Sequence, residues 1–361
     1  MKVSKYDLRI ILLWFAIFQF YIPNEKIYYV YQAVVAGFIF LDSFEQIIKR
    51  PKYLLMFMYP LTIIISCIIN RDTILYTQVF RGCIGALLIM DIFLVIKQYE
   101  KKRGVDKLFE ILYNMSKLYV VFSILWVIVL GMMGSLQKAV LEEFLFMRGK
   151  FPTAYMLIFY LMLFGLTWNG NHIFSKKWKK TLFVLQVIAC IGICTLIETS
   201  TGIMAIFIFL ILTLFGKNLM RFIDNPFVIV GMIILSMFFV LGLSAILRFS
   251  FVQNIIVNIL HEDLSLTGRM ELYTLLFPLI LKAGLWGGGF GSYVAATLAY
   301  HGWYNAQNGL AEIILTYGFA GGIAFLLLVF TSVACAKNSN IMFYLVIFVF
   351  IVVAVVEIPF N

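Results

Sequence analysis

Eleven apolar runs, separated by short polar connections, set the pattern of this chain. The runs are continuous and do not alternate, which predicts helices and argues against a transmembrane barrel. Several fall short of the roughly 20 residues that a straight bilayer crossing needs, so we expect local thinning or partners at their edges. The runs lie at residues 10–21, 28–41, 53–69, 74–96, 118–134, 152–168, 181–197, 202–216, 226–247, 318–336 and 341–358.

The composition places these helices in lipid. Of the 361 residues, 63% are hydrophobic and only 13% are charged, which is more apolar surface than a water-soluble domain could bury. We therefore expect an all-α, polytopic integral membrane bundle with about 11 transmembrane helices (10–12). The whole chain, residues 1–361, forms a single membrane domain in this interpretation.

The positive charge indicates orientation in the membrane. The net charge is +10, but Lys and Arg cluster in short connections between the apolar runs, which does not suggest a nucleic-acid partner. With the N-terminus in the cytoplasm, the cytoplasmic segments hold 19 of these residues and the outer segments hold 8. The five cysteines all lie within apolar runs and form no C-x-x-C pair, so we expect neither disulfides nor a metal site.

One connection stands apart from the rest. Residues 248–317 form a long loop that this orientation places outside the cytoplasm, and long connections are often functional. We expect short helices within it, one of them starting after Thr267. Residues 284–291, GLWGGGFG, predict a turn in which the backbone approaches its neighbours closely. Farther on, Asn305, Asn308 and Glu312 fall on one face of a further helix.

The order of motifs in this loop resembles the O-antigen polymerase and O-antigen ligase superfamily (Wzy-like). The motifs are Gly268-Arg269, a proline, the glycine-rich turn, and residues 318–321, Gly-Phe-Ala-Gly, opening the next span. Residues 198–204, ETSTGIM, and 148–154, RGKFPTA, are weaker matches. Where ligases of the family carry His before Asn, this chain has Gln307, which favours a polymerase. Where many members have Arg, it has Thr201.

The resemblance implies a membrane glycosyltransferase without cofactor or metal. Its substrate would be an undecaprenyl-diphosphate-linked oligosaccharide, polymerised into O-antigen or capsular polysaccharide on the outer face of the bacterial inner membrane. Chain-length regulator and flippase proteins would be its partners beside the lipid bilayer. An O-antigen ligase, a transporter or flippase of lipid-linked glycans, and a non-catalytic assembly protein stay open as alternatives.

Such a transfer needs cations that bind the diphosphate. The candidates are four basic residues, Arg81, Arg148, Lys150 and Arg269. Arg81 lies inside an apolar run, where an arginine costs about 2.5–3.5 kcal/mol at a helix centre. A structural pair with Asp91 or Gln78 is the alternative to a functional role. Arg148 and Lys150 could equally face solvent or lipid headgroups.

The remaining candidates serve proton transfer and sugar binding. Glu271 and His301 are the candidate general bases, although Glu271 could instead pair with a cation and His301 could be an interfacial residue. The candidates for contacts with sugar hydroxyls are Tyr273, Tyr304, Gln307, Asn308 and Glu312. Helix packing or an aromatic belt at the membrane surface would also explain these residues. The chain has no Walker loop, H-E-x-x-H or G-x-S-x-G motif.

Overall fold

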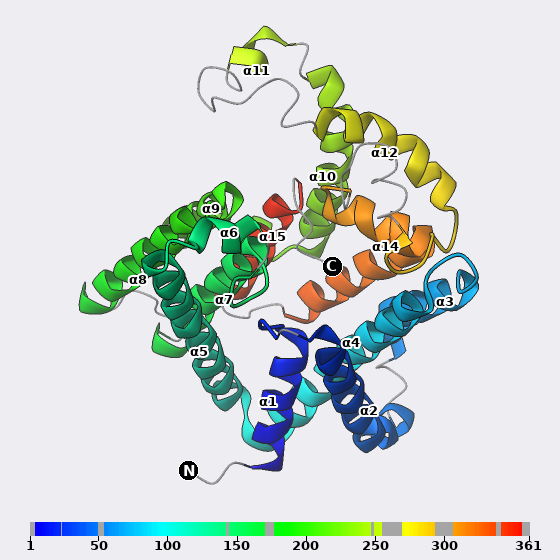
Figure 1. The fold of residues 1–361 in the computed structure, drawn as a ribbon, viewed down its shortest axis with the longest axis horizontal. Helices are drawn as coiled ribbons and strands as arrows, with labels where there is room; N and C mark the ends of the chain where they lie inside the picture. Colours follow the sequence, from blue (N-terminus) through cyan, green and yellow to red (C-terminus); the bar gives the residue numbers. More distant parts are fainter. Residues whose placement is uncertain are drawn as a thin grey trace. The chain divides into compact units, whose positions relative to one another are not determined.

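The computed structural model contains helices throughout its described residues, which are 4–22, 24–49, 54–141, 144–169, 177–246, 249–254, 269–292, 306–336 and 341–355 (Figure 1). No strand occurs in these ranges. The helices are α1 (Lys5–Ile17), α2 (Glu25–Lys49), α3 (Leu54–Ile69), α4 (Tyr76–Arg103), α5 (Val105–Met132), α6 (Leu136–Leu141), α7 (Lys150–Asn169), α8 (Lys177–Leu196), α9 (Ser200–Ile223), α10 (Pro226–Ile246), α11 (Ser250–Asn254), α12 (Arg269–Ala283), α14 (Gly309–Cys335) and α15 (Ile341–Val353).

Four of the described helices are long and apolar enough to cross a membrane. They are α4, α5, the first 18 residues of α7, and α14. Six further helices hold described apolar stretches of 10–17 residues each. The all-helical membrane character expected from the sequence is therefore present, whereas the count of about eleven spans is not confirmed. The count of four covers only the described residues, and α9 and α10, with 24 and 21 residues, are not among the four.

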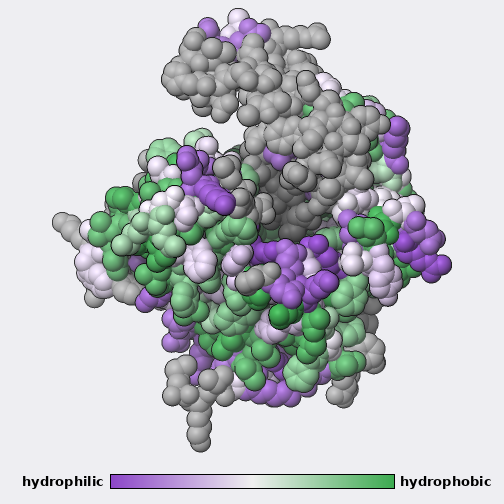
Figure 2. Space-filling model, viewed as in Figure 1, coloured by the Kyte–Doolittle hydropathy of each residue, from purple (hydrophilic) through white to green (hydrophobic). Residues whose placement is uncertain are grey.

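The surface agrees with an apolar environment. Large hydrophobic side chains are exposed along one side of α5, including Leu125, Ile128 and Val129. Figure 2 shows apolar residues spread widely over the visible face, with hydrophilic residues gathered in separate patches. Side chains of this kind on a helix surface are stable where lipid, not water, covers them.

The chain divides into two compact units. Unit 1 comprises Met1–Tyr53, Leu87–Arg221 and Asn338–Val349, and unit 2 comprises Leu54–Ala86, Phe222–Lys337 and Phe350–Asn361. In unit 1, α5 packs on α7, α7 on α8, and α1 on α2. Its interior is rich in rings, for example Phe164 stacked on Phe183 with centroids 6.2 Å apart.

Unit 2 is built around α14. This helix packs against α3, α10 and α12, and α10 also packs against α12 (Figure 1). Every residue from Gly309 to Gly318 is buried, so the first part of α14 is the core of the unit. The further helix and the span expected from residue 318 form this one element, but it begins only at Gly309. Asn308 precedes it in an extended conformation, so the expected polar face of Asn308 and Glu312 on one helix is wrong, and Asn305 lies outside the described residues.

Candidate functional sites

Helix α14 is broken at Gly318, and the glycine-rich turn fills the break. Gly318 has φ 70° and ψ −173°, outside the helical region, so the backbone groups on either side of it lose their partners within the helix. The turn after α12 supplies replacements through four backbone hydrogen bonds, two in each direction. The N–H groups of Gly288 and Gly289 in the turn donate to the carbonyls of Leu315 (3.0 Å) and Thr316 (2.9 Å) in α14. In the other direction, the N–H groups of Phe319 and Ala320 in α14 donate to the carbonyls of Gly284 (3.1 Å) and Leu285 (3.0 Å).

Two glycines are required where the backbones meet. A Cβ added to Gly287 would lie 2.4 Å from the nitrogen of Gly318, and one added to Gly318 would lie 2.2 Å from the oxygen of Leu285. Both glycines also have positive φ. The close approach expected of this sequence is present, and it is directed at the break in α14.

Helix α3 holds the turn from another side. The Ser66 hydroxyl lies within hydrogen-bond distance of the carbonyl oxygens of Trp286 (2.6 Å) and Thr316 (3.1 Å), so it joins the turn to α14. The side-chain amide of Asn70 donates to the carbonyl of Gly287 at 3.1 Å. The polar side chains of the apolar helix α3 thus find hydrogen-bond partners in carbonyl groups of the turn and of α14. In return, these carbonyl groups gain partners that helical hydrogen bonding does not give them.

Arg81 lies beside this turn. Its guanidinium is 5.8 Å from the ring centroid of Phe290, within the range of a cation–π contact. The next residue, Gly82, allows the approach, since a Cβ there would be 2.5 Å from the Cys67 sulfur and 2.9 Å from Phe290. Arg81 is exposed. The Asp91 carboxylate, weighed above as its partner, is fully buried, and neither of its oxygens has a hydrogen-bond partner in the described part of the chain.

Four of the five expected sugar-binding residues lie inside the protein. Tyr273, Gln307, Asn308 and Glu312 are at most 7% exposed. The Tyr273 hydroxyl donates to the carbonyl of Gln307 at 3.3 Å. One Glu312 carboxylate oxygen accepts the N–H of Ala306 at 2.8 Å. Gln307 has φ 51°, which is unusual for a residue other than glycine.

Asn308 caps α14. Its side-chain oxygen accepts the N–H of Ala311 at 3.0 Å, and its amide nitrogen donates to the carbonyl of Ala354 at 3.1 Å. The N–H of Gly309 also donates to Ala354, at 3.0 Å. These contacts tie the start of α14 to the chain after α15, which is the packing role named above as the alternative to sugar binding.

In unit 1, Arg148 and Lys150 lie just before and at the start of α7. The Arg148 guanidinium forms an ion pair with Glu25 and donates to the side-chain oxygen of Gln19 at 3.3 Å. The Lys150 ammonium donates to the carbonyl of Glu198 at 3.3 Å. Arg148 and Glu198 both have positive φ, 61° and 53°. The two weaker motifs of the sequence therefore meet in space.

The structure does not describe the side chains of four of the predicted residues. Arg269 and Glu271 belong to the first turn of α12, whose backbone is described. His301 and Tyr304 lie outside the described residues.

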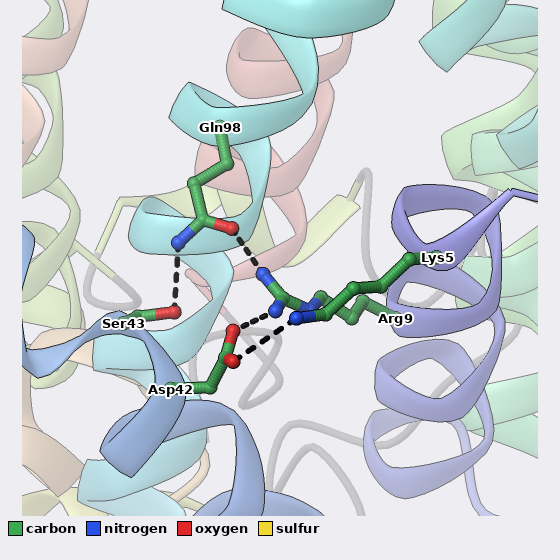
Figure 3. A network of polar contacts seen from close by, with 5 residues as sticks. All are labelled: Lys5, Arg9, Asp42, Ser43 and Gln98. Atoms are coloured by element: carbon green, nitrogen blue, oxygen red, sulfur yellow. Dashed lines mark hydrogen bonds and ion pairs between the residues drawn. The ribbon is translucent and has the colours of Figure 1, made fainter.

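A charged network lies at the start of α1, where Lys5 and Arg9 count among the basic residues of the expected cytoplasmic side. Figure 3 shows both side chains directed at Asp42 of α2, with Arg9 also donating to Gln98 of α4. The Gln98 amide in turn donates to the Ser43 hydroxyl at 2.9 Å. Arg9 is only 5% exposed, and the ion pair and hydrogen bonds offset the cost of burying its charge.

Asp7 forms a second cluster on the same helix. Its carboxylate accepts the Tyr99 hydroxyl at 2.7 Å and pairs with Arg103 at 3.3 Å. Burial acts to raise the pKa of Asp7, but hydrogen bonds from the Ser4 backbone and Tyr99, with the charge of Arg103, outweigh it and lower the pKa. Ser4 and Asp7 form a capping box, a signal that the sequence does carry.

Comparisons with protein-family models, with curated proteins and with solved structures give no match for this chain.

Proposed function

We propose that the protein is a membrane glycosyltransferase that polymerises lipid-linked oligosaccharides without a metal ion. The donor would be an undecaprenyl-diphosphate-linked repeat unit, and the product an O-antigen or capsular polysaccharide made on the outer face of the cytoplasmic membrane. The proposal includes about eleven crossings and a cytoplasmic N-terminus.

The contact between Arg81 and the glycine-rich turn carries this proposal. More than 200 residues separate them in sequence, yet Arg81 lies against Phe290 of the loop in which the chemistry is expected. Arg81 is the sixth residue of α4, about 7.5 Å along the helix from its first residue. If that end of α4 faces outward, the guanidinium lies near the headgroup level, where the diphosphate of a lipid donor would be.

The residues then divide the reaction among them. An acceptor hydroxyl oxygen attacks the anomeric carbon of the donor, the bond from that carbon to the diphosphate oxygen breaks, and the diphosphate leaves with the bonding electrons. Arg81 and Arg269 neutralise the growing negative charge. Glu271 or His301 takes the proton of the hydroxyl. Tyr273 and Gln307, which are hydrogen-bonded to each other, shape the wall of the site. Asn308 and Glu312 hold the backbone around α14, with which their side chains form hydrogen bonds.

The test uses purified protein with a synthetic undecaprenyl-diphosphate oligosaccharide repeat in EDTA without nucleotide, followed on a gel. We expect a ladder that Arg81→Ala and Arg269→Ala reduce at least tenfold. Arg71→Ala is the matched control, since Arg71 is an exposed arginine in the connection between α3 and α4. A ladder of unchanged intensity in Arg81→Ala would refute the proposed donor site. A single transfer to a different acceptor would indicate a ligase.

The broken helix favours a second candidate, a transporter of lipid-linked glycans. Discontinuous membrane helices are common where transporters bind substrates. In unit 2, α14 is interrupted at Gly318, and its freed backbone groups bond to another segment. Liposomes that contain the protein and a fluorescent lipid-linked glycan distinguish the two candidates. Movement of the glycan lipid between leaflets, without any ladder, would establish transport in place of polymerisation.

A further inference from the structure

A cluster of aromatic rings lies on the chain segments that carry Arg148 and its partner Gln19 in unit 1. The rings of Phe20 and Phe146 are stacked with centroids 6.2 Å apart, and the N–H of Tyr21 donates to the carbonyl of Phe146 at 2.8 Å. Phe20 follows Gln19 and Phe146 precedes Arg148 by two residues, so rings and ion pair share one place. We call the residues Gln19, Phe20, Tyr21, Glu25, Phe146 and Arg148 the aromatic ledge.

Further contacts fix the rings in position. Tyr21 lies 5.5 Å from Phe144 and 6.3 Å from Trp126, measured between ring centroids. The indole N–H of Trp126 donates to the carbonyl of Phe144 at 2.9 Å. Phe20 and Tyr21 are half-buried, and the neighbouring Phe144 and Trp126 are 42% and 38% exposed, so part of this ring surface is open. A membrane-interface belt would explain scattered rings, but it does not require an ion pair held among them.

The charges of the aromatic ledge cancel one another. Arg148 pairs with one carboxylate oxygen of Glu25, and the other oxygen accepts the Tyr29 hydroxyl at 3.2 Å. A diphosphate arriving at Arg148 would therefore meet the negative charge of Glu25. An uncharged polyhydroxy ligand would not, and it could use both the N–H donors of Arg148 and the acceptors of Glu25 and Gln19.

We infer that the aromatic ledge binds the uncharged sugar rings of a glycan. The hydroxyl groups of a sugar would bond to Gln19, Glu25 and Arg148, while the apolar C–H face of the ring would lie on the Phe20 and Tyr21 side chains. This assignment moves Arg148 from diphosphate binding to sugar binding. It rests on the proposed function for the origin of the glycan, but binding itself requires neither lipid nor transfer.

The backbone offers a clean pair of variants. Arg148 and Glu198 both have positive φ, which glycine adopts without strain. Arg148→Gly removes the guanidinium, and Glu198→Gly removes an exposed carboxylate outside the aromatic ledge. Both variants should therefore be folded, which thermal unfolding in detergent would verify. Phe20→Ala removes one ring of the stack.

The experiment measures binding of purified protein in detergent micelles to an array of free oligosaccharides, both neutral and uronic-acid-containing. We expect neutral oligosaccharides to bind, Arg148→Gly and Phe20→Ala to weaken binding about tenfold or more, and Glu198→Gly to leave it unchanged. Absence of binding, preference for acidic glycans, or full binding by Arg148→Gly would overturn the inference. Binding without a polymer ladder would contradict the proposed function alone, and a ladder without glycan binding would contradict the aromatic ledge alone.

Discussion

Asn308 illustrates what a single residue can and cannot reveal from sequence. An amide next to Gln307 in a long loop suggested contacts with sugar hydroxyls, yet its oxygen accepts the N–H of Ala311 and its nitrogen donates to Ala354. The sequence can suggest that Asn308 caps a helix, because the N–H that it accepts lies only three residues farther along the chain. The hydrogen bond to Ala354 spans 46 residues and cannot be predicted from the local sequence.

Replacement of Asn308 should destabilise the protein strongly. Asn308→Ala loses the cap and leaves buried backbone groups without partners, which together cost about 2 kcal/mol or more. Asn308→Asp keeps the acceptor but places a carboxylate oxygen against the carbonyl of Ala354, so we expect a larger loss. Thermal unfolding in detergent measures both.

The control is Asn225→Ala. Asn225 accepts the N–H of Phe227 at the start of α10, but it is exposed. Water replaces the lost bond there, and the cost should be about 1 kcal/mol or less. Equal melting temperatures for Asn308→Ala and Asn225→Ala would show that the buried contacts of Asn308 contribute nothing.

At the scale of elements, α14 departs from a regular helix at one residue. An interruption inside an apolar bundle is stable only if the freed N–H and C=O groups find other partners. The turn after α12 supplies them, with Ser66 of α3 as a third contributor. The glycine-rich turn and the Gly318 break therefore depend on each other, and neither should persist without the other.

Gly318→Ala tests this dependence. A Cβ at that position would lie 2.2 Å from the Leu285 oxygen and would also be strained at φ 70°. We expect a loss of at least about 2 kcal/mol, seen as a lower melting temperature. Gly231→Ala in α10 is the matched control, because nothing lies within 4 Å of its Cβ. It should be neutral or stabilising by about 0.5–1 kcal/mol. A Gly318→Ala protein as stable as the wild type would argue against the break.

At the scale of the whole molecule, the distribution of Lys and Arg along the sequence predicts an orientation with the N-terminus in the cytoplasm. The buried Arg9 and Asp7 clusters join α1, α2 and α4 at the end that this distribution assigns to the cytoplasm. The proposed chemistry requires the opposite ends of these helices to face outward.

Single cysteines can test this orientation. In a protein with Cys335, the exposed native cysteine, changed to serine, we introduce Lys26→Cys or Lys101→Cys, both at exposed positions. A membrane-impermeant maleimide added to intact cells should label only Lys26→Cys. Permeabilised cells should show labelling of both. Labelling of Lys101→Cys in intact cells would reverse the orientation and remove the basis for chemistry on the outer face.

The sequence alone determined the all-helical membrane character, because continuous apolar runs leave a chain in lipid few ways to satisfy its backbone. It also predicted the glycine-rich turn, since the local backbone requires glycine there. The number of crossings stays a prediction, because four of the described helices are long and apolar enough to cross a membrane and hydropathy alone does not decide the others.

The tertiary structure decided which distant segments meet. The partners of the turn are Gly318 and Ser66, and the ion-pair network joins Arg9 to Asp42 and Gln98. Periodicity places a residue on a face of its own helix, but it does not state which helix lies opposite. Contacts across tens to hundreds of residues depend on how the helices pack, and that information is not local.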